Sequence, residues 1–225
     1  MHKKLPTIFL AATLLALMTA PAALATGTKA QKSRDMLQDD CRRITARAER
    51  AYGIPAQLLS AISMAESGYW YEAEKARIAW PWTVYAEGKG IYHPDRDSAQ
   101  EAVADLRARG VSNIDVGCMQ INLYHHGKAF DDVEQAMDPH RNVDYAARFL
   151  RRLHDRHRSW SQAVAHYHSS TVQFNRPYRQ KVMKLWHQEQ RAFNARRREQ
   201  AQREYREHRE RLRRARLAET QLSER

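Results

Sequence analysis

The segment that decides the fold is Ile54–Ser67, IPAQLLSAISMAES, an apolar stretch that ends on a carboxylate. Its pattern predicts a helix with Pro55 in the first turn. Leu59, Ile62 and Glu66 are spaced i, i+3 and i+7, so they share one helix face. Because that face must pack on the core, we expect Glu66 at the edge of the core and at the C-terminal end of the helix.

This position has consequences for the acidity of Glu66. Burial disfavours the charged form of a carboxyl group, and so does the negative end of a helix dipole. Both effects raise the pKa of Glu66. A carboxylic acid that stays protonated near neutral pH is suited to act as a general acid in glycosidic cleavage. Helical spacing alone is equally compatible with an ordinary glutamate at an exposed helix end.

The remaining pattern predicts one mostly α-helical domain, over about residues 38–187. The chain has 225 residues, of which 43% are hydrophobic and 28% charged, and this composition excludes a wholly disordered protein. Asp138 and Pro139 are typical of a helix start, and Val143, Ala146 and Leu150 follow with helical spacing. Further helices are predicted for DSAQEAVADLRARG, SWSQAVAHYHSS and YRQKVMKLW. The expected insertion at about 70–110 includes a small β-hairpin or flap around EGKG.

The two ends of the chain differ from the domain. Residues 1–25 combine a basic start, an apolar run and a small-residue cleavage site after Ala25, which predicts a secretory signal peptide. We therefore expect a periplasmic or secreted protein, with a linker at 26–37. The Arg/Glu-rich tail at 188–225 is expected to be a charged helix or disordered. From Gln190 onward it holds 12 Arg and 6 Glu, which is half of the net charge of +12.

Two cysteines, Cys41 and Cys118, lie in segments that look helical and partly apolar. Export would place them in an oxidising compartment, where a disulfide can form. Sequence does not show whether they approach each other, and two buried thiols are the simpler interpretation.

Three short motifs follow one another in the chain. They are Glu66-Ser67, then GCMQIN at 117–122, then AHYHS at 165–169. Their order resembles the soluble lytic transglycosylase family, whose members carry Glu-Ser, Gly-Leu-Met-Gln-Ile and Ala-Tyr-Asn-Ala-Gly and have a lysozyme-like fold. The sequence of the second motif is most similar to that of the members associated with conjugation and type IV secretion. The resemblance covers about residues 39–186.

The resemblance implies a role for each matching residue. Glu66 corresponds to the single catalytic acid/base, and Ser67 to a residue that shapes the turn after it. Met119 and Gln120 correspond to residues that line the sugar groove, and Tyr167 to a tyrosine beside the catalytic carboxyl. His168 replaces the family's asparagine, so it is a candidate substrate-binding residue whose hydrogen bonds differ. No metal or other cofactor is expected, and the histidines have poor spacing for a metal site.

The reaction implied is cleavage of the β-1,4 bond between N-acetylmuramic acid and N-acetylglucosamine in peptidoglycan, which leaves a 1,6-anhydro end. Two alternatives stay open. Asp115 corresponds to the second carboxylate of animal lysozymes, so the chain could be a hydrolytic muramidase; an aspartate there could equally brace the turn before Gly117. The altered third motif is also compatible with a non-catalytic wall-binding protein on the same fold.

The expected partners follow from the same resemblance and from the charge. The substrate would be the glycan strands of peptidoglycan, and the protein is expected to be a monomer. The basic tail could bind an envelope or secretion-machine partner, or it could simply be solvated. A nucleic-acid partner suits the charge but not an exported protein, so none is expected. The aromatic residues of the insertion, Trp80, Trp82, Tyr85 and Tyr92, could stack on sugars or form a small core of their own.

Overall fold

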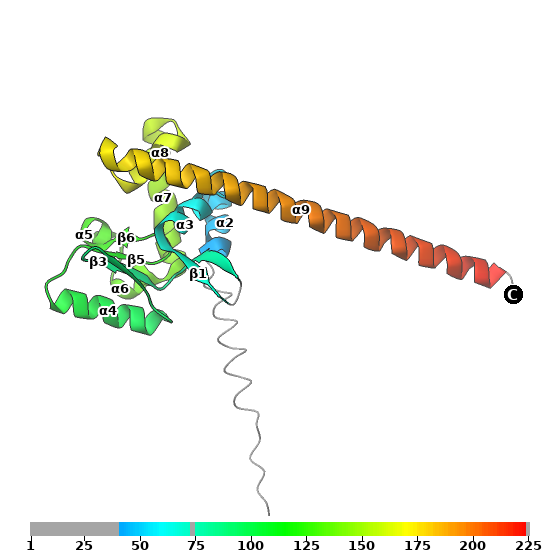
Figure 1. Ribbon diagram of the computed structural model, residues 1–225, viewed down its shortest axis with the longest axis horizontal. Helices are drawn as coiled ribbons and strands as arrows, with labels where there is room; N and C mark the ends of the chain where they lie inside the picture. Colours follow the sequence, from blue (N-terminus) through cyan, green and yellow to red (C-terminus); the bar gives the residue numbers. More distant parts are fainter. Residues whose placement is uncertain (1–40, 73–74, 224–225) are drawn as a thin grey trace, which may run out of the picture. The chain divides into compact units, whose positions relative to one another are not determined.

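A computed structural model describes residues 41–72 and 75–223; the predicted signal peptide and linker lie outside the described residues. The fold is mostly α-helical with small antiparallel sheets, as the sequence predicts (Figure 1). The helices are α2 (Cys41–Tyr52), α3 (Leu58–Ser67), α4 (Arg96–Ala108), α5 (Leu123–His126), α6 (Val133–Met137), α7 (Pro139–His157), α8 (Trp160–His168) and α9 (Val172–Ser223), with a 3-10 turn at Gly127–Ala129. The strands are β1 (Gly68–Tyr71), β2 (Ala76–Ala79), β3 (Thr83–Ala86), β4 (Lys89–Tyr92), β5 (Ile114–Val116) and β6 (Ile121–Asn122).

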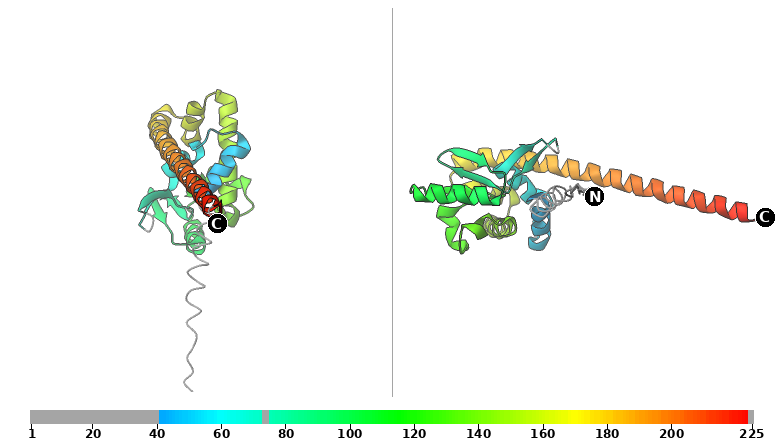
Figure 2. Two further views of the ribbon diagram at one scale, coloured as in Figure 1. Left: turned by 90° about the vertical axis from the view of Figure 1, so that its right-hand side faces the viewer. Right: turned by 90° about the horizontal axis from the view of Figure 1, so that it is seen from below.

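Five helices form the main core by packing in a closed order. α2 packs on α7, α7 on α8, α8 on α9, α9 on α3, and α3 again on α2 (Figures 1 and 2). The predicted stripe on α7 is confirmed, because Val143, Ala146 and Leu150 are fully buried. Asp138 caps this helix by accepting a hydrogen bond from the Arg141 backbone N–H at 2.9 Å. The apolar face of α3 therefore lies inside a ring of helices, with its last turn at the edge.

The start of α3 differs from the prediction. The helix begins at Leu58 rather than near Pro55, and Gln57 before it has left-handed backbone angles. No side chain of that segment caps the helix. Instead, the buried carboxylate of Glu49 on α2 accepts hydrogen bonds from the backbone N–H groups of Gln57, Leu59 and Ser60 at 2.8–3.1 Å. An anion at a helix N-terminus satisfies otherwise unpaired donors, so Glu49 locks α3 onto α2.

The structure contains more β-structure than the one small element predicted. The expected hairpin is present as β3–β4, with Glu87 and Gly88 in its turn. Two further strands, β5 just before the second motif and β6 at its end, extend it to a sheet with the order β4-β3-β5-β6. β1 and β2 form a separate hairpin directly after α3. Strands of two to four residues are too short to show an alternating pattern, which explains why the sequence did not indicate them.

The aromatic residues of the insertion divide between a small core and the surface. Trp80 and Trp82 are buried, and the Tyr69 ring packs on Trp80 at 5.5 Å and on Tyr92 at 4.8 Å. Tyr92 nevertheless keeps part of its ring exposed, as does Tyr85. The two tryptophans are thus structural, and they cannot stack on a sugar.

The structure corrects the prediction for the two cysteines. They form a disulfide, Cys41–Cys118, with Cα atoms 5.8 Å apart and both residues fully buried. The interpretation of the two cysteines as buried free thiols is therefore wrong. The predicted helix at Cys118 is also wrong, because this residue lies in the turn between β5 and β6. The bond joins the first residue of α2 to the second motif across 77 positions, a long-range pairing that spacing alone does not reveal.

We expect this disulfide to contribute strongly to stability. Replacing both cysteines with serine should lower the free energy of unfolding by about 2–4 kcal/mol, because the cross-link restricts the unfolded chain. Denaturant unfolding with and without a reductant measures this. Reductant should shift the wild-type midpoint and leave the double variant unchanged. Equal wild-type midpoints in both conditions would contradict the expectation.

The last helix crosses the predicted boundary between the domain and its tail. YRQKVMKLW does not stand alone, because α9 begins at Val172 and continues to Ser223 as one helix (Figure 1). Its first part contributes Tyr178 and Val182 to the core, whereas residues 194–217 are all exposed. In the described part of the chain, no helix has both the length and the apolar character needed to cross a membrane.

Candidate active site

Glu66 lies where its sequence spacing predicts. It occupies the last turn of α3, behind the fully buried residues Leu59 and Ile62, and it is itself partly buried. Its neighbours come from three distant parts of the chain: Tyr178 and Lys181 from α9, Tyr167 from α8, and Asp115 from β5, with His168 of α8 stacked on Tyr178. We call this group, with Glu66, the Glu66 cluster.

The environment raises the pKa of Glu66 to about 7. Burial is the main cause, and the negative charge of Asp115 adds to it. A hydrogen bond from the Tyr178 hydroxyl to Oε1, at 2.5 Å, and the positive charge of Lys181 act in the opposite direction. A carboxyl group with this pKa is present in both protonation states near neutral pH, so it can donate a proton and then accept one.

Tyr178 is a site residue that sequence reasoning missed. Its ring is buried and stacks on His168 with centroids 4.5 Å apart. Tyr178, Val182 and Leu185 follow each other with helical spacing along α9, a pattern that predicts a core face and not a polar contact. Only the fold brings its hydroxyl to Glu66, which lies 112 positions earlier.

Tyr167 lies near Glu66, and His168 stacks on Tyr178, whose hydroxyl donates to Glu66. The Tyr167 hydroxyl donates to the backbone oxygen of Met119 at 3.1 Å. Burial and the charge of Glu66 raise the pKa of Tyr167 well above its usual value, so it stays protonated. Burial and then Lys181 lower the pKa of His168, which favours its neutral form. Both side chains therefore present neutral polar groups beside the carboxyl.

Ser67 connects Glu66 to the second motif. Its hydroxyl donates to the backbone oxygen of Cys118 at 2.8 Å, and the Ser63 hydroxyl reaches the same oxygen at 3.2 Å. Ser67 is buried, so it acts on the shape of the chain after Glu66. The disulfide holds the same loop from its other side.

Met119 and Gln120 have different surroundings from those the resemblance implies for a sugar groove. The Met119 side chain is fully buried, so it supports the site from beneath. Gln120 is partly exposed and has left-handed backbone angles. Its amide nitrogen donates to the backbone oxygens of Thr83 and Gly117 at 3.1 and 3.0 Å. Gln120 thus ties the loop to β3.

Asn142 is a second residue that sequence reasoning missed. Its fully buried side chain accepts a hydrogen bond from the Met119 N–H and donates to the backbone oxygens of Val116 and Ala136, all at 2.9–3.0 Å. A signal was available, because Asn142 is a polar residue on the helix face that also carries Ala146 and Leu150. Buried polar groups are normally paired, so such a residue indicates a bound loop.

Asp115 belongs to the cluster but is bonded elsewhere. Its Oδ1 accepts a hydrogen bond from Asn122 at 2.7 Å, which braces β5 against β6. Burial raises the pKa of Asp115, while Asn122, His168 and His125 lower it. The negative charge of Asp115 also raises the pKa of Glu66, so Asp115 lies within electrostatic range of that carboxyl. Within the described residues, no group of three or more His, Cys, Asp or Glu is arranged to hold a metal ion.

The raised pKa of Glu66 makes the stability of the protein depend on pH. Between about pH 4.5 and 7 the folded protein keeps a proton on Glu66 that the unfolded chain has released. The free energy of unfolding should therefore fall as the pH rises through this window, by up to about 3 kcal/mol. The pKa of Glu49 is also raised, so the wild type alone does not isolate the effect of Glu66. The Glu66→Gln variant provides the reference, because it lacks only the contribution of Glu66. Denaturant unfolding at both ends of the window should show a shallower pH dependence for Glu66→Gln; equal slopes would contradict the shift.

A ring of helices with a small sheet beside it, and a glutamate of raised pKa at the end of a buried helix, are the arrangement of a lysozyme-like fold with a site suited to acid/base cleavage of glycans. The model of one family, the transglycosylase SLT domain, matches residues 43–185. The chain belongs to this family, whose members are peptidoglycan lytic transglycosylases, and the family inferred from the three motifs is confirmed. No curated protein and no solved structure matches the chain.

Proposed function

We propose that this protein cleaves the β-1,4 bond between N-acetylmuramic acid and N-acetylglucosamine with Glu66 as the single acid/base, and leaves a 1,6-anhydro end. The observation that carries the proposal is the position of Glu66 at the end of α3, bonded to the Tyr178 hydroxyl, where burial raises its pKa to about 7. The reaction needs one group that is first an acid and then a base, and a carboxyl balanced between both forms at neutral pH meets this need.

The proposed reaction has two steps. First, protonated Glu66 gives its proton to the glycosidic oxygen; the bond from this oxygen to C1 of the muramic acid breaks, and its electron pair stays on the leaving oxygen. The carbonyl oxygen of the substrate's own N-acetyl group bonds to C1, as in substrate-assisted glycosidases. Second, ionised Glu66 takes the proton of the C6 hydroxyl, O6 bonds to C1, and the acetyl oxygen leaves. Glu66 is protonated again, and no water is consumed.

The other residues of the cluster would support these steps. Tyr178 can donate to the ionised carboxylate after the first step, which stabilises the base form. Tyr167 would orient Met119 and its loop through the bond to the backbone oxygen. His168, stacked on Tyr178 and exposed, can offer its imidazole to the substrate. Gln120 and Ser67 would keep the loop in place beside the sugar.

Hydrolysis is a second candidate, and one observation favours it. Asp115 lies close enough to Glu66 to raise its pKa, so a second carboxylate is available for water attack. Its hydrogen bond to Asn122 argues instead for a bracing role. The cyclising reaction remains the better proposal, because Asp115 is occupied within the sheet.

Mass spectrometry of the products decides between these reactions. The purified protein is incubated with isolated sacculi, and the soluble muropeptides are analysed. Products lighter by one water than the hydrolysis products are expected. Reducing-end products of full mass would contradict the proposal, and Asp115→Asn would then be the variant that should lose activity. Binding to sacculi with no released product would support a non-catalytic wall-binding protein.

We further propose that the protein is exported, acts as a monomer, and uses the exposed part of α9 to bind an anionic partner in the envelope, such as a component of a secretion machine. The predicted signal peptide supports export. The exposed residues 194–217 include ten Arg and four Glu and carry no core face, which favours electrostatic binding. Retention of the protein on envelope fractions should fall with rising salt; retention that salt does not change would contradict the proposal.

A further inference from the structure

One face of α9 carries an exposed aromatic ring next to the Glu66 cluster. Phe174, Tyr178 and Lys181 are spaced i, i+4 and i+7, so they share a face of the helix. On this face, Tyr178 donates to Glu66 and Lys181 donates to the backbone oxygen of Ala65 at 2.6 Å. Phe174 lies one turn before Tyr178, about 6 Å along the axis. Its side chain is 56% exposed, whereas Tyr178 is buried.

A second exposed ring is connected to the cluster through the sheet. Asn122 donates to Asp115 and accepts from the backbone N–H groups of Tyr124 and His125, both at 3.0 Å. Tyr124 therefore sits at the start of α5, two residues beyond the partner of Asp115. Its ring contacts His125 edge-on at 5.0 Å and is 67% exposed. Figure 1 draws α5 and the first turn of α9 at the same end of the domain.

We propose that Phe174 and Tyr124 are binding platforms for pyranose rings of the glycan strand, beyond the two sugars that meet at Glu66. The flat face of an aromatic ring suits the apolar C–H face of a pyranose, and contact with a sugar covers a ring that otherwise faces water. Phe174 stands on α9, which also carries Tyr178, and the Tyr124 backbone N–H is bonded to Asn122, the partner of Asp115, so little backbone freedom is lost on binding. The inference rests on the proposed glycan substrate and adds contacts for a longer strand.

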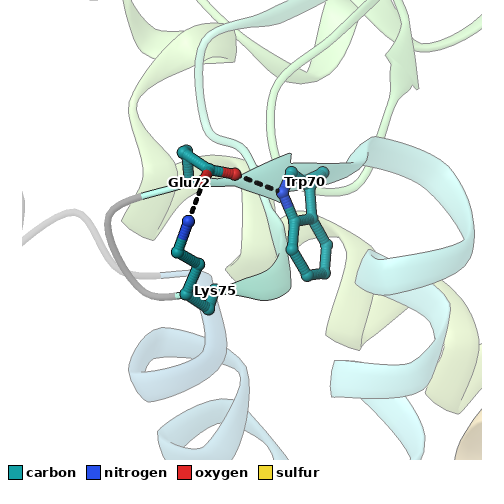
Figure 3. Close-up of polar contacts among 3 residues, drawn as sticks. All are labelled: Trp70, Glu72 and Lys75. Atoms are coloured by element: carbon teal, nitrogen blue, oxygen red, sulfur yellow. Dashed lines mark hydrogen bonds and ion pairs between the residues drawn. The ribbon is translucent and has the colours of Figure 1, made fainter.

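Trp70 also has an exposed ring, but its side chain points away from the Glu66 cluster. It shares a strand face with Gly68, and a Cβ on Gly68 would meet the backbone oxygen and the sulfur of Met64. Met64 lies two residues before Glu66, nearly on the opposite side of α3. The Trp70 indole N–H donates to Glu72, which also pairs with Lys75 within the hairpin (Figure 3). Trp70 is therefore a matched control for an exposed aromatic residue outside the platform.

The test measures binding without cleavage, in the Glu66→Gln background. Isothermal titration with N-acetylglucosamine oligomers of increasing length gives the dissociation constants. Phe174→Ala and Tyr124→Ala should each weaken binding of the longer oligomers about two- to tenfold, the range of single aromatic contacts. Binding of the disaccharide should change less. Trp70→Ala and Tyr205→Ala, which remove exposed rings elsewhere, should change neither.

Two conservative variants separate stacking from packing. Phe174→Trp and Tyr124→Phe keep a flat ring and should keep the affinity, whereas Phe174→Leu keeps an apolar side chain and should lose it. Unchanged affinity in both alanine variants would overturn the inference, and the proposed function would still stand if the wild type released anhydro products. If the Glu66→Gln parent bound no oligomer and the wild type released no product, the proposed function would fail together with the inference.

Discussion

Replacing Glu66 with Gln is expected to reduce the release of muropeptides from sacculi at least about a thousandfold, while the protein stays folded. The substitution keeps the size of the side chain, and the amide oxygen can still accept the hydrogen bond from Tyr178. What is lost is the proton of the first step and the base of the second. Because one group would serve both steps, no other residue replaces it. Initial rates of product release, followed by mass spectrometry, measure the loss.

Glu49 provides the matched control for this experiment. It is also a buried glutamate whose pKa is raised by burial, but its carboxylate caps α3 through three backbone N–H groups. Glu49→Gln keeps one accepting oxygen and places the amide N–H₂ group against at least one of these donors, that of Gln57, so it should lower the unfolding midpoint and leave the rate per folded molecule nearly unchanged. Glu66→Gln should leave the unfolding midpoint nearly unchanged and abolish most of the cleavage per folded molecule. Substantial cleavage by the folded Glu66→Gln variant would remove Glu66 from the mechanism.

The local elements of this fold could be predicted from the sequence. Periodicity predicted α7 from Val143, Ala146 and Leu150, and it placed Glu66 at the edge of the core at the end of α3. In each case the information lies within a few turns of one helix. The order of the three motifs indicated the family, which the family comparison confirms.

The contacts that complete the site could not be predicted in this way, because they join distant residues. Tyr178 reaches Glu66 across 112 positions, and Glu49 caps a helix that it does not belong to. The disulfide joins a helix start to a turn between two strands. Each of these contacts depends on how helices pack, while the side chain itself looks like an ordinary core residue or surface charge in the sequence. The exposed rings Phe174 and Tyr124 were missed for the same reason.

Asn142→Ala should lower the free energy of unfolding by about 3–5 kcal/mol, the second large effect that we expect. The side chain accepts a hydrogen bond from one backbone N–H and donates to two backbone oxygens, and alanine removes all three bonds. The same loop carries Met119 and Gln120, so the rate of cleavage by the folded variant should fall as well. Urea unfolding measures the stability, with Asn194→Ala on the exposed part of α9 as the control. A loss below about 1 kcal/mol would contradict this role.

Gly117 allows a second test of the role of Asn142, because it lies directly against the Asn142 side chain. A Cβ at Gly117 would come within 2.6 Å of the Asn142 side-chain nitrogen, and the backbone there is left-handed, with φ of +82°. Gly117→Ala should therefore combine a clash with a backbone cost of about 1–2 kcal/mol. In the Asn142→Ala background the clash disappears and the new methyl group finds space, so only the backbone cost should remain. The double-mutant cycle should deviate from additivity by at least about 1 kcal/mol. Additive losses would mean that Asn142 and the loop are not in contact, and the account of how the loop is held beside Glu66 would fail with them.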